Sequence, residues 1–325
     1  MRYFYTDNGK LLERKPKIIF AFKGRLRGTG SRYMRCDQLA DFTRRSYGET
    51  YDICVDVLPH PQHKPARWKK FLKLAEGAVV ISLKGSTDIL SDEELGELRN
   101  TASGLAIDHV DSFSGGGVFV KADLHIAASQ ASENFMFKKC ERIALRDGFE
   151  IPRIALVDHH ADERIKATPQ PAGTNLKIAY IGDSENTFVP SEIESDMLDF
   201  SVDAQTDFEM ALSEIPKAHI HYAVRGETKL RQPKPFTKGF TAALANRNVI
   251  CTPEVHDALR FLGENYPFMS RNSSKSSILE VVEFARQSIG SSEWNEGLVA
   301  MREMREHVRP ENVSRQLISA IETFF

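Results

Sequence analysis

One basic segment in the second half of the chain has the residue types that bind a diphosphate group. The sequence KPFTK, from Lys234 to Lys238, lies where a predicted helix at 236–246 begins, and the preceding predicted strand ends at Arg225. The free amide groups of a helix N-terminus attract anions. Lys234 and Lys238 are four residues apart and can reach the same phosphate, to which Thr237 can donate its hydroxyl. The alternative is an exposed basic helix start that binds no ligand.

A second group of candidates, rich in carboxylate and imidazole, follows a predicted strand in the first half. Asp108, His109 and Asp111 lie at or near the carboxyl end of the strand expected at 105–110. A histidine with a carboxylate nearby can act as a general base, so these three residues are the catalytic candidates. The alternative is structural, with Asp111 capping the next segment and His109 buried in the core. The glycines at 115–117 indicate a movable loop beside them.

A basic, glycine-containing loop at 23–32 follows the first apolar strand pattern. Gly28 and Gly30 allow a tight turn, and Ser31 and Arg32 start the next predicted helix, whose amides can hold an anion. We expect these four residues to contact an anion or an acceptor, and a solvated basic turn is the alternative. The glycine spacing fits neither the dinucleotide-binding fingerprint nor a Walker loop.

Histidines and cysteines give little support for a metal site. His159 and His160 are adjacent at a strand end and point to opposite faces, so they do not readily share a metal ion, although one of them can contact a ligand. The four cysteines are far apart, with no C-x-x-C pair. We therefore expect no metal, and reduced thiols that are mostly buried in a cytoplasmic protein.

The candidate residues lie at the ends of strands that alternate with helices. In the first half, the apolar pattern predicts strands at 18–22, 51–58, 78–83, 105–110, 124–128 and 153–157. Helices are predicted between them at 31–45, 65–76, 91–101 and 133–147. Ser91 and Glu94 form a capping box at the start of the third of these helices. A segment rich in proline, glycine and threonine at 167–175 is the expected linker.

After this linker the alternation of strands and helices restarts. Strands are predicted at 176–182, 219–224, 249–252 and 267–269, and helices at 207–214, 236–246, 254–262, 275–289, 293–307 and 310–325. Strands alternating with helices imply mostly parallel sheets with helices on both faces. We therefore predict an α/β fold with two Rossmann-like, doubly wound domains that face a central cleft.

The segment 234–252 resembles the donor-site signature of glycosyltransferases of the GT-B fold. Its sequence, KPFTKGFTAALANRNVICT, is similar to the K-P-x-T-K variant of polysaccharide-type transferases. The strand at 176–182 is similar to the start of their nucleotide-sugar domain, and the C-terminal helices are similar to those that cross back onto the N-terminal domain. The resemblance implies an acceptor-side domain at 1–170, a donor domain at 171–305 and a helix at 306–325 that packs on the first domain.

The same resemblance implies an activity and roles for the candidate residues. The protein would transfer a sugar from a nucleotide-diphosphate sugar to a glycan or lipid-linked saccharide, with no metal and no other cofactor. The diphosphate leaving group would be neutralised by Arg225, Lys234 and Lys238 and hydrogen-bonded by Thr237 and Thr241. Asp108, His109 or Asp111 would take the proton of the acceptor hydroxyl if the enzyme inverts the anomeric centre.

Two departures from the family pattern favour an alternative function. Many retaining members carry two glutamates eight residues apart around this helix, and the corresponding positions here are Pro233 and Thr241. The usual Arg and Lys after the first donor strand are replaced by the acidic sequence IGDSEN at 181–186. The alternative is a non-catalytic GT-B-like protein that binds a nucleotide sugar or a glycan.

The net charge of −2 hides an asymmetry along the chain. Residues 1–75 contain 17 Lys and Arg against seven Asp and Glu, and the remaining 250 residues contain 26 against 38. This balance suits an anionic acceptor, or the membrane surface that carries it. The helix at 65–76 places four basic residues beside Trp68 and Phe71, which predicts shallow interfacial contact, with a solvated helix face as the alternative.

Several classes of protein are excluded or disfavoured. No apolar run of about 18 residues could span a membrane, and the first residues do not resemble a secretory signal. Known nucleic-acid motifs are absent, so we expect no nucleic-acid partner. In neither half of the chain is the first predicted strand followed by G-x-G-x-x-G, which disfavours a nicotinamide enzyme. We expect a cytoplasmic protein that can reach the inner face of the membrane.

Overall fold

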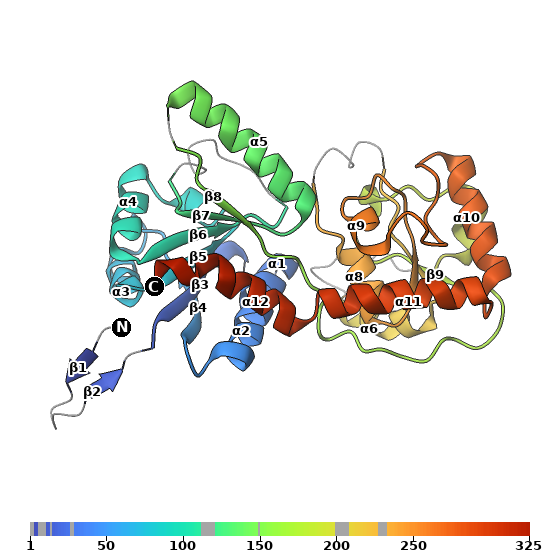
Figure 1. Cartoon of the computed structure of the whole chain (residues 1–325), viewed down its shortest axis with the longest axis horizontal. Helices are drawn as coiled ribbons and strands as arrows, with labels where there is room; N and C mark the ends of the chain where they lie inside the picture. The colour runs from blue at the N-terminus through green and yellow to red at the C-terminus, as the bar shows by residue number, and fades with distance from the viewer. Residues whose placement is uncertain are drawn as a thin grey trace. The chain divides into compact units, whose positions relative to one another are not determined.

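Two α/β units make up the chain (Figure 1). The computed structural model describes residues 3–5, 11–13, 15–26, 29–111, 121–148, 150–198, 208–226 and 233–325. Unit 1 comprises Met1–Ala128, Glu133–Val157 and Pro310–Phe325, and unit 2 comprises Ser129–Ser132 and Asp158–Arg309.

A six-stranded parallel sheet forms the centre of unit 1. Its strands are β3 (Lys17–Lys23), β4 (Asp52–Leu58), β5 (Val79–Leu83), β6 (Gly104–Asp108), β7 (Leu124–Ala127) and β8 (Arg153–Leu156). Their order across the sheet is β4-β3-β5-β6-β7-β8, and each neighbouring pair is parallel. The predicted strands of the first half are confirmed. The sequence pattern missed a short antiparallel pair, β1 (Tyr3–Tyr5) and β2 (Leu11–Glu13).

Both faces of this sheet are covered by helices. Alternate residues of β3, Ile18, Phe20 and Phe22, pack in one cluster with buried residues of α2 (Leu39–Tyr47) and α12 (Pro310–Ile321). The residues between them, Ile19 and Ala21, pack with α3 (Pro65–Ala75) and α4 (Asp92–Thr101) on the other face. Successive side chains of a strand point to opposite faces, so this division confirms the doubly wound arrangement.

Local sequence signals explain where several helices begin. The Ser91 hydroxyl accepts a hydrogen bond from the Glu94 amide, and the Glu94 carboxylate accepts one from the Ser91 amide, so the predicted capping box is confirmed. Proline occupies the first turn of α3, where no amide donor is needed. The helix predicted at 31–45 is interrupted. It consists of α1 (Gly30–Arg32), a π-helical turn η2 (Tyr33–Gln38) and α2.

The chain returns to unit 1 after completing unit 2. Helix α12 follows unit 2 in sequence but packs beside α2, as Figure 1 shows. Val313, Leu317 and Ile321 of α12 are fully buried in the core of unit 1. Helix α5 (Gln130–Asp147) begins in unit 2 and continues in unit 1.

The transition between the units differs from the expected linker. The long segment of unit 2 begins at Asp158, so the segment at 167–175 lies inside this unit. The guanidinium of Arg247, which is fully buried, donates hydrogen bonds to the carbonyl oxygens of Thr168 and Pro169, at 2.9 and 2.7 Å. A segment rich in proline and glycine has irregular backbone, but tertiary hydrogen bonds can hold that backbone in place.

A three-stranded parallel sheet forms the centre of unit 2. Its order is β11 (Asn248–Ile250), β10 (Ile220–Tyr222) and β9 (Ile178–Ala179). The strand expected at 267–269 is reduced to a single bridge between Cys251 and Met269. The helices in the described part of unit 2 are α6 (Phe208–Glu214), α8 (Thr237–Leu244), α9 (Ala258–Leu262), α10 (Lys275–Ser288) and α11 (Ser292–His307).

Short 3-10 turns complete the described secondary structure. They are η1 (Gly24–Leu26), η3 (Thr87–Ile89), η5 (Ser184–Asn186), η6 (Ser191–Asp196), η7 (Ile215–Lys217) and η8 (Glu322–Phe324). In the described part of the chain, no helix combines the length and the apolar character needed to cross a membrane.

Candidate functional site

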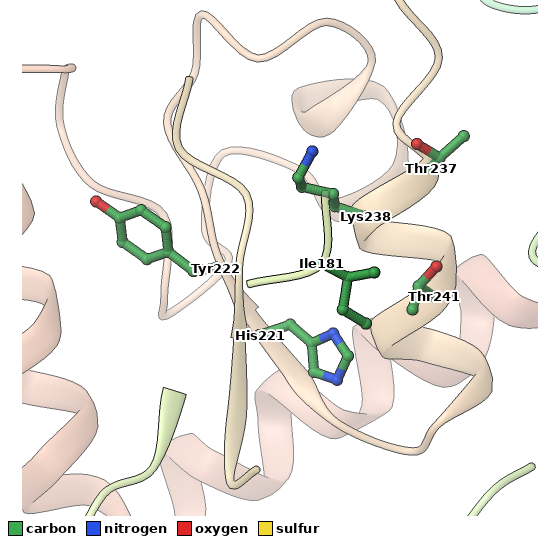
Figure 2. Close-up of a pocket in the computed structure, with 6 residues that line it drawn as sticks. All are labelled: Ile181, His221, Tyr222, Thr237, Lys238 and Thr241. Carbon is green, nitrogen blue, oxygen red and sulfur yellow. The ribbon is translucent and has the colours of Figure 1, made fainter. Parts of the chain in front are cut away.

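A small cavity lies in unit 2 between β10 and the start of α8. It has a volume of about 100 Å³ and is lined by Ile181, His221, Tyr222, Thr237, Lys238 and Thr241. Figure 2 shows that α8 supplies the lysine and both threonines, whereas the histidine comes from β10. Ligands bind to parallel α/β sheets at the carboxyl ends of the strands. The cavity therefore occupies the place where such a sheet binds its ligand.

The first turn of α8 is suited to hold an anion. Phe236 occupies the N-cap position and makes no side-chain hydrogen bond to the helix, and no acidic residue lies in the first turn. The first amides of a helix have no partner within it, so here they are left to other acceptors. Together with the helix dipole, these amides favour a negative charge beside Thr237 and Lys238.

Lys238 lies among positive charges and aromatic carbon. Its ammonium lies 4.8 Å from the ring centroid of Tyr180. Burial, followed by repulsion from Arg225 and Lys234, lowers the pKa of Lys238 to about 8. Desolvation and like charges both disfavour the ammonium form, so an anion that neutralises this group would bind favourably.

Gly182 makes room for this lysine. It has a φ of +144°, and a Cβ atom at this position would lie 3.1 Å from the Lys238 Nζ. A side chain there would strain the backbone and press on the ammonium group. The loop is fixed by Tyr180, whose hydroxyl donates to the Asp183 carbonyl oxygen at 2.7 Å, and by Thr187, whose hydroxyl donates to the Val224 carbonyl oxygen at 2.9 Å.

The structure gathers the five predicted diphosphate ligands in unit 2. Thr237, Lys238 and Thr241 line the cavity, and Arg225 and Lys234 lie near enough to act on the charge of Lys238. Arg225 is 9% exposed and follows β10. The five residues lie within 17 positions of sequence, between the end of β10 and the second turn of α8.

Sequence reasoning missed His221, Tyr180 and Gly182. His221 lies between Ile220 and Tyr222 in β10, and a histidine within a hydrophobic strand pattern is the sequence signal for this position. Burial, followed by the charge of Arg247, lowers the pKa of His221 to about 3, so the ring is neutral. Gly182 follows directly after a predicted strand, where glycine often permits close approach of another group.

Asp108 is buried at the carboxyl end of β6 and paired with an arginine. The Arg35 Nε donates to Asp108 Oδ2 at 2.7 Å, and neither side chain is exposed by more than 1%. Asp108 Oδ1 accepts a hydrogen bond from the Val110 amide at 3.1 Å. Both carboxylate oxygens are therefore engaged inside the unit. Arg35 belongs to the π-helical turn η2, so this pair connects the glycine-loop segment to β6.

His109 and Asp111 have different surroundings. His109 is 3% exposed, and its Nε2 shares a hydrogen bond with Nδ1 of His125, on β7, at 2.9 Å. Asp111 forms an ion pair with Lys84, and about a quarter of its side chain is exposed. The three predicted catalytic residues are thus clustered in unit 1 but are each bonded to another side chain.

The predicted anion-binding loop is only partly described. Gly28 lies outside the described residues, and Gly30 and Ser31 begin α1. The Arg32 side chain forms a 3.0 Å ion pair with Asp37, and its guanidinium lies 4.7 Å from the ring centroid of Phe22. Arg32 is therefore directed partly back onto its own unit.

The histidines after β8 are held by the backbone. Nδ1 of His159 and Nδ1 of His160 each donate to a main-chain carbonyl oxygen at 2.8 Å, and both rings are buried. In the described part of the chain, no three His, Cys, Asp or Glu side chains are grouped as metal ligands.

The aromatic residues of α3 do not face solvent as the interfacial prediction requires. Trp68 is 5% exposed and Phe71 is 3% exposed, and both pack in the core of unit 1. The indole of Trp68 also donates to the Glu97 carboxylate at 2.9 Å. The aromatic side chains form the inner face of the helix, so contact with a membrane surface stays a prediction for its basic side chains alone.

A larger hollow of about 470 Å³ lies in unit 1 beside the loops that precede β5 and β6. Its lining residues are Glu76, Gly77, Asn100, Thr101, Ala102 and Ser103. It contains one ionisable side chain and lies near the amino ends of the strands. Its chemistry and its place in the sheet therefore favour it less than the smaller cavity of unit 2.

The sequence matches no protein-family model and no curated protein sequence. Solved structures do match over nearly the whole chain. A glycosyltransferase from Rickettsia africae ESF-5 has a TM-score of 0.61 at 10% identity, covering 96% of this chain and 99% of that chain. The lipopolysaccharide outer core galactosyltransferase WaaB has a TM-score of 0.59 at 10% identity, covering 95% and 100%. Anabaena HepE, solved with UDP and glucose, has a TM-score of 0.55 at 12% identity, covering 95% and 100%.

These structures share the two-unit α/β architecture described above, with one Rossmann-like sheet in each unit. The C-terminal helix of this chain also belongs to unit 1. The chain therefore has the GT-B fold, the fold of the glycosyltransferases to which it is similar.

Proposed function

We propose that the protein is a glycosyltransferase that uses a nucleotide-diphosphate sugar and transfers its sugar to a glycan or lipid-linked saccharide. The observation that carries this proposal is the cavity of unit 2, where an uncapped helix start, Lys238 and two threonine hydroxyls converge. HepE, a protein of the same fold, was solved with UDP-glucose. The fold and the chemistry of the cavity support the same class of donor.

The chemistry required of this site is stabilisation of a leaving diphosphate. As the bond to the sugar breaks, negative charge grows on the diphosphate oxygens. Lys238, Arg225 and Lys234 offer positive charge that is already in place, and the amides of α8 add hydrogen bonds. These groups can do this work without a metal ion, so metal independence is part of the proposal.

Unit 1 would supply the group that accepts the proton of the acceptor hydroxyl. Both oxygens of Asp108 are engaged by Arg35 and a backbone amide, and His109 is buried and bonded to His125. Asp111, about a quarter of whose side chain is exposed, is therefore better placed for this role. Basic side chains exposed on α3, Arg67 and Lys70 among them, suit an anionic acceptor or the membrane surface that carries it. We place the protein on the cytoplasmic side of that membrane.

A second candidate function is binding without turnover. It is favoured by Pro233 and Thr241, which occupy the positions of the two glutamates found in many retaining relatives. Such a protein would keep the diphosphate site and bind the nucleotide sugar or a glycan.

Calorimetric titration and product release separate the two candidates. UDP, GDP, CDP and TDP, with their sugars, are titrated into the whole protein, and release of the nucleoside diphosphate is then measured with lipid-linked and free saccharide acceptors. Lys238→Ala should weaken binding by about 10- to 100-fold, since hydrogen bonds to charged groups contribute about 1.5–3 kcal/mol. Lys217→Ala, an exposed lysine of the same unit, is the control.

Each outcome decides between them. Binding with diphosphate release supports the transferase, whereas binding without release on any acceptor supports the binding protein. No binding of any nucleotide at millimolar concentration contradicts both the transferase and a protein that binds a nucleotide sugar.

A further inference from the structure

The chain passes between the two units four times, and these crossings lie between residues 128 and 129, 132 and 133, 157 and 158, and 309 and 310. Segments at the boundary of a unit usually make few contacts and are flexible. Here the residues on the unit 2 side are bonded instead. Each crossing has a residue, at most two positions from its boundary in unit 2, that contacts a side chain of the short helix α9 or of its N-cap.

Arg260 of α9 binds the residue that follows the third crossing with both arms of its guanidinium. Its Nη1 donates to Asp158 Oδ1 at 2.6 Å, and its Nη2 donates to Asp158 Oδ2 at 2.8 Å. The Asp158 side chain is buried. A two-pronged pair of this kind fixes the orientation of the carboxylate as well as its distance.

His307 brings the fourth crossing to the same pair. It is the last residue of α11 and lies two positions before Arg309, where unit 2 ends. Its Nε2 lies 3.2 Å from Asp158 Oδ2 and 3.4 Å from Arg260 Nη2. The third and fourth crossings are therefore held at one point of unit 2.

Asp257, the N-cap residue of α9, binds the segment between the first two crossings. Its Oδ2 accepts a hydrogen bond from the Gln130 amide at 3.0 Å, and its Oδ1 accepts one from the Ala131 amide at 3.3 Å. Gln130 is the first residue of α5, and the first amides of a helix have no partner within it. The buried carboxylate satisfies these two amides and matches the positive end of the helix dipole.

Helix α9 is itself fixed on the helix that begins at the candidate diphosphate site. The ring of Phe261 lies edge-on to the ring of Phe240 in α8, with a distance of 5.1 Å between their centroids. The same ring lies 5.2 Å from the ring centroid of His307 and 4.6 Å from the guanidinium carbon of Arg260. Ala258 of α9 is fully buried in the core of unit 2. The residues that bind the crossings are therefore attached to the packed core around α8.

We propose that α9 is a conformational clasp, formed by Asp158, Asp257, Arg260 and His307, that holds the chain at all four crossings and fixes these segments to the core around α8. The four crossings are the covalent connections between the units, so the clasp limits how many of their backbone dihedral angles can rotate. The clasp needs neither a ligand nor catalytic activity and is therefore independent of the proposed function.

Residue-resolved hydrogen exchange of the whole protein tests the clasp. The amides of Gln130 and Ala131 have no partner within α5, so slow exchange of these amides in the wild-type protein is the expected sign of the bond to Asp257. Asp257→Gly removes the carboxylate and suits the φ of +65° at this position. We expect it to speed the exchange of both amides at least about tenfold, and Asp257→Asn, which keeps one acceptor oxygen, to do so less.

A second variant tests the other two crossings. Arg260→Met removes the guanidinium and keeps a long side chain, and it should speed amide exchange at 157–160 and 307–309 at least about tenfold. The matched control is Arg302→Met, since Arg302 is an exposed arginine of α11 that forms no ion pair within the described residues. This control should exchange at the wild-type rate. Amides of β10 and β11 report on general loss of stability and should change less than those at the crossings.

The outcomes decide for or against the clasp. Wild-type exchange at the crossings in Asp257→Gly and Arg260→Met overturns it, and so does equal acceleration at the crossings and in β10 and β11. If Arg260→Met does not fold, Arg260→Lys replaces it, because lysine keeps the charge and loses the two-pronged pair. Fast exchange of the Gln130 and Ala131 amides in the wild-type protein also overturns the clasp. No nucleotide is used, so a failure here leaves the proposed diphosphate site standing, and the reverse holds as well.

Discussion

Lys238 combines a lowered pKa with a place at the helix start where a diphosphate would bind, and this makes binding depend on pH. Its pKa in the folded protein is about 8, below the value of 10.5 for a free lysine. Between these values the unfolded chain binds a proton that the folded protein has released, so the free energy of unfolding rises with pH over this window. A bound diphosphate restores the charged form and reverses this shift.

We therefore expect affinity for UDP to fall above pH 8, by up to roughly tenfold per pH unit. Titration calorimetry at pH 9 in two buffers of different ionisation enthalpy should detect uptake of a proton on binding. Lys238→Met should abolish this uptake. A dissociation constant that stays the same from pH 7 to pH 9.5 would contradict the assignment of Lys238 to the diphosphate.

Asp108 gives a second test at the scale of one residue. Removing its carboxylate leaves the buried guanidinium of Arg35 without its ion-pair partner, which costs about 3–5 kcal/mol. Asp108→Ala should therefore unfold at a clearly lower denaturant concentration than the wild-type protein. Asp111→Ala, which breaks a partly exposed ion pair with Lys84, should cost less than about 1 kcal/mol.

Equal stability of Asp108→Ala and the wild-type protein, combined with loss of turnover, would instead support the catalytic role predicted for Asp108. The double variant Arg35→Met with Asp108→Leu should recover much of the lost stability, because it replaces both charges by apolar groups.

At the scale of one element, the start of α8 depends on a glycine. A Cβ atom at Gly239 would lie 2.2 Å from a ring carbon of Phe236, which is buried at the N-cap of the helix. Gly239→Ala must therefore displace the ring or the helix, at a cost of about 1–3 kcal/mol. Because Lys238 precedes this glycine, affinity for UDP should fall as well.

Chemical denaturation and UDP titration measure both effects. The control is Gly96→Ala in α4, where a Cβ atom would meet nothing within 4 Å. Alanine is favoured over glycine inside a helix by about 1 kcal/mol, so this variant should be at least as stable as the wild-type protein. A Gly239→Ala variant with wild-type stability and affinity would show that α8 accommodates the side chain without moving.

At the scale of the whole molecule, the end of the chain completes the first unit. Leu317 of α12 is fully buried in the core of unit 1, although unit 2 precedes it in sequence. Leu317→Ala should destabilise unit 1 by about 2–5 kcal/mol, the usual cost of removing a buried leucine side chain. Differential scanning calorimetry, with and without UDP, shows which unfolding transition the substitution lowers.

We expect UDP to raise the Tm of the unfolding transition of unit 2. Leu317→Ala should leave this rise in Tm unchanged. Leu145→Ala, a leucine that is 82% exposed on α5, should change neither transition. Loss of UDP stabilisation in Leu317→Ala would show that the donor site depends on the core of unit 1.

Much of the fold could be predicted from the sequence because its signals are local. Apolar periodicity indicated the six strands of unit 1, and the Ser91–Glu94 pair marked the start of α4. The predicted strand at 267–269 failed, since a three-residue apolar run does not specify a partner strand. The segment at 167–175 has the composition of a linker but is fixed by Arg247, 79 residues away from Thr168.

The sequence by itself determined the α/β class, the two sets of alternating strands and helices, and a basic helix start at Lys234–Lys238. Only the tertiary structure decided that His221 lines the same cavity as Lys238 and that Gly182 makes room for that lysine. It also decided that Arg35 forms a buried ion pair with Asp108. The physical reason is that periodicity within a segment encodes which face is buried. The partner that meets this face depends on strand order and register, which bring together residues such as Arg35 and Asp108, 73 positions apart.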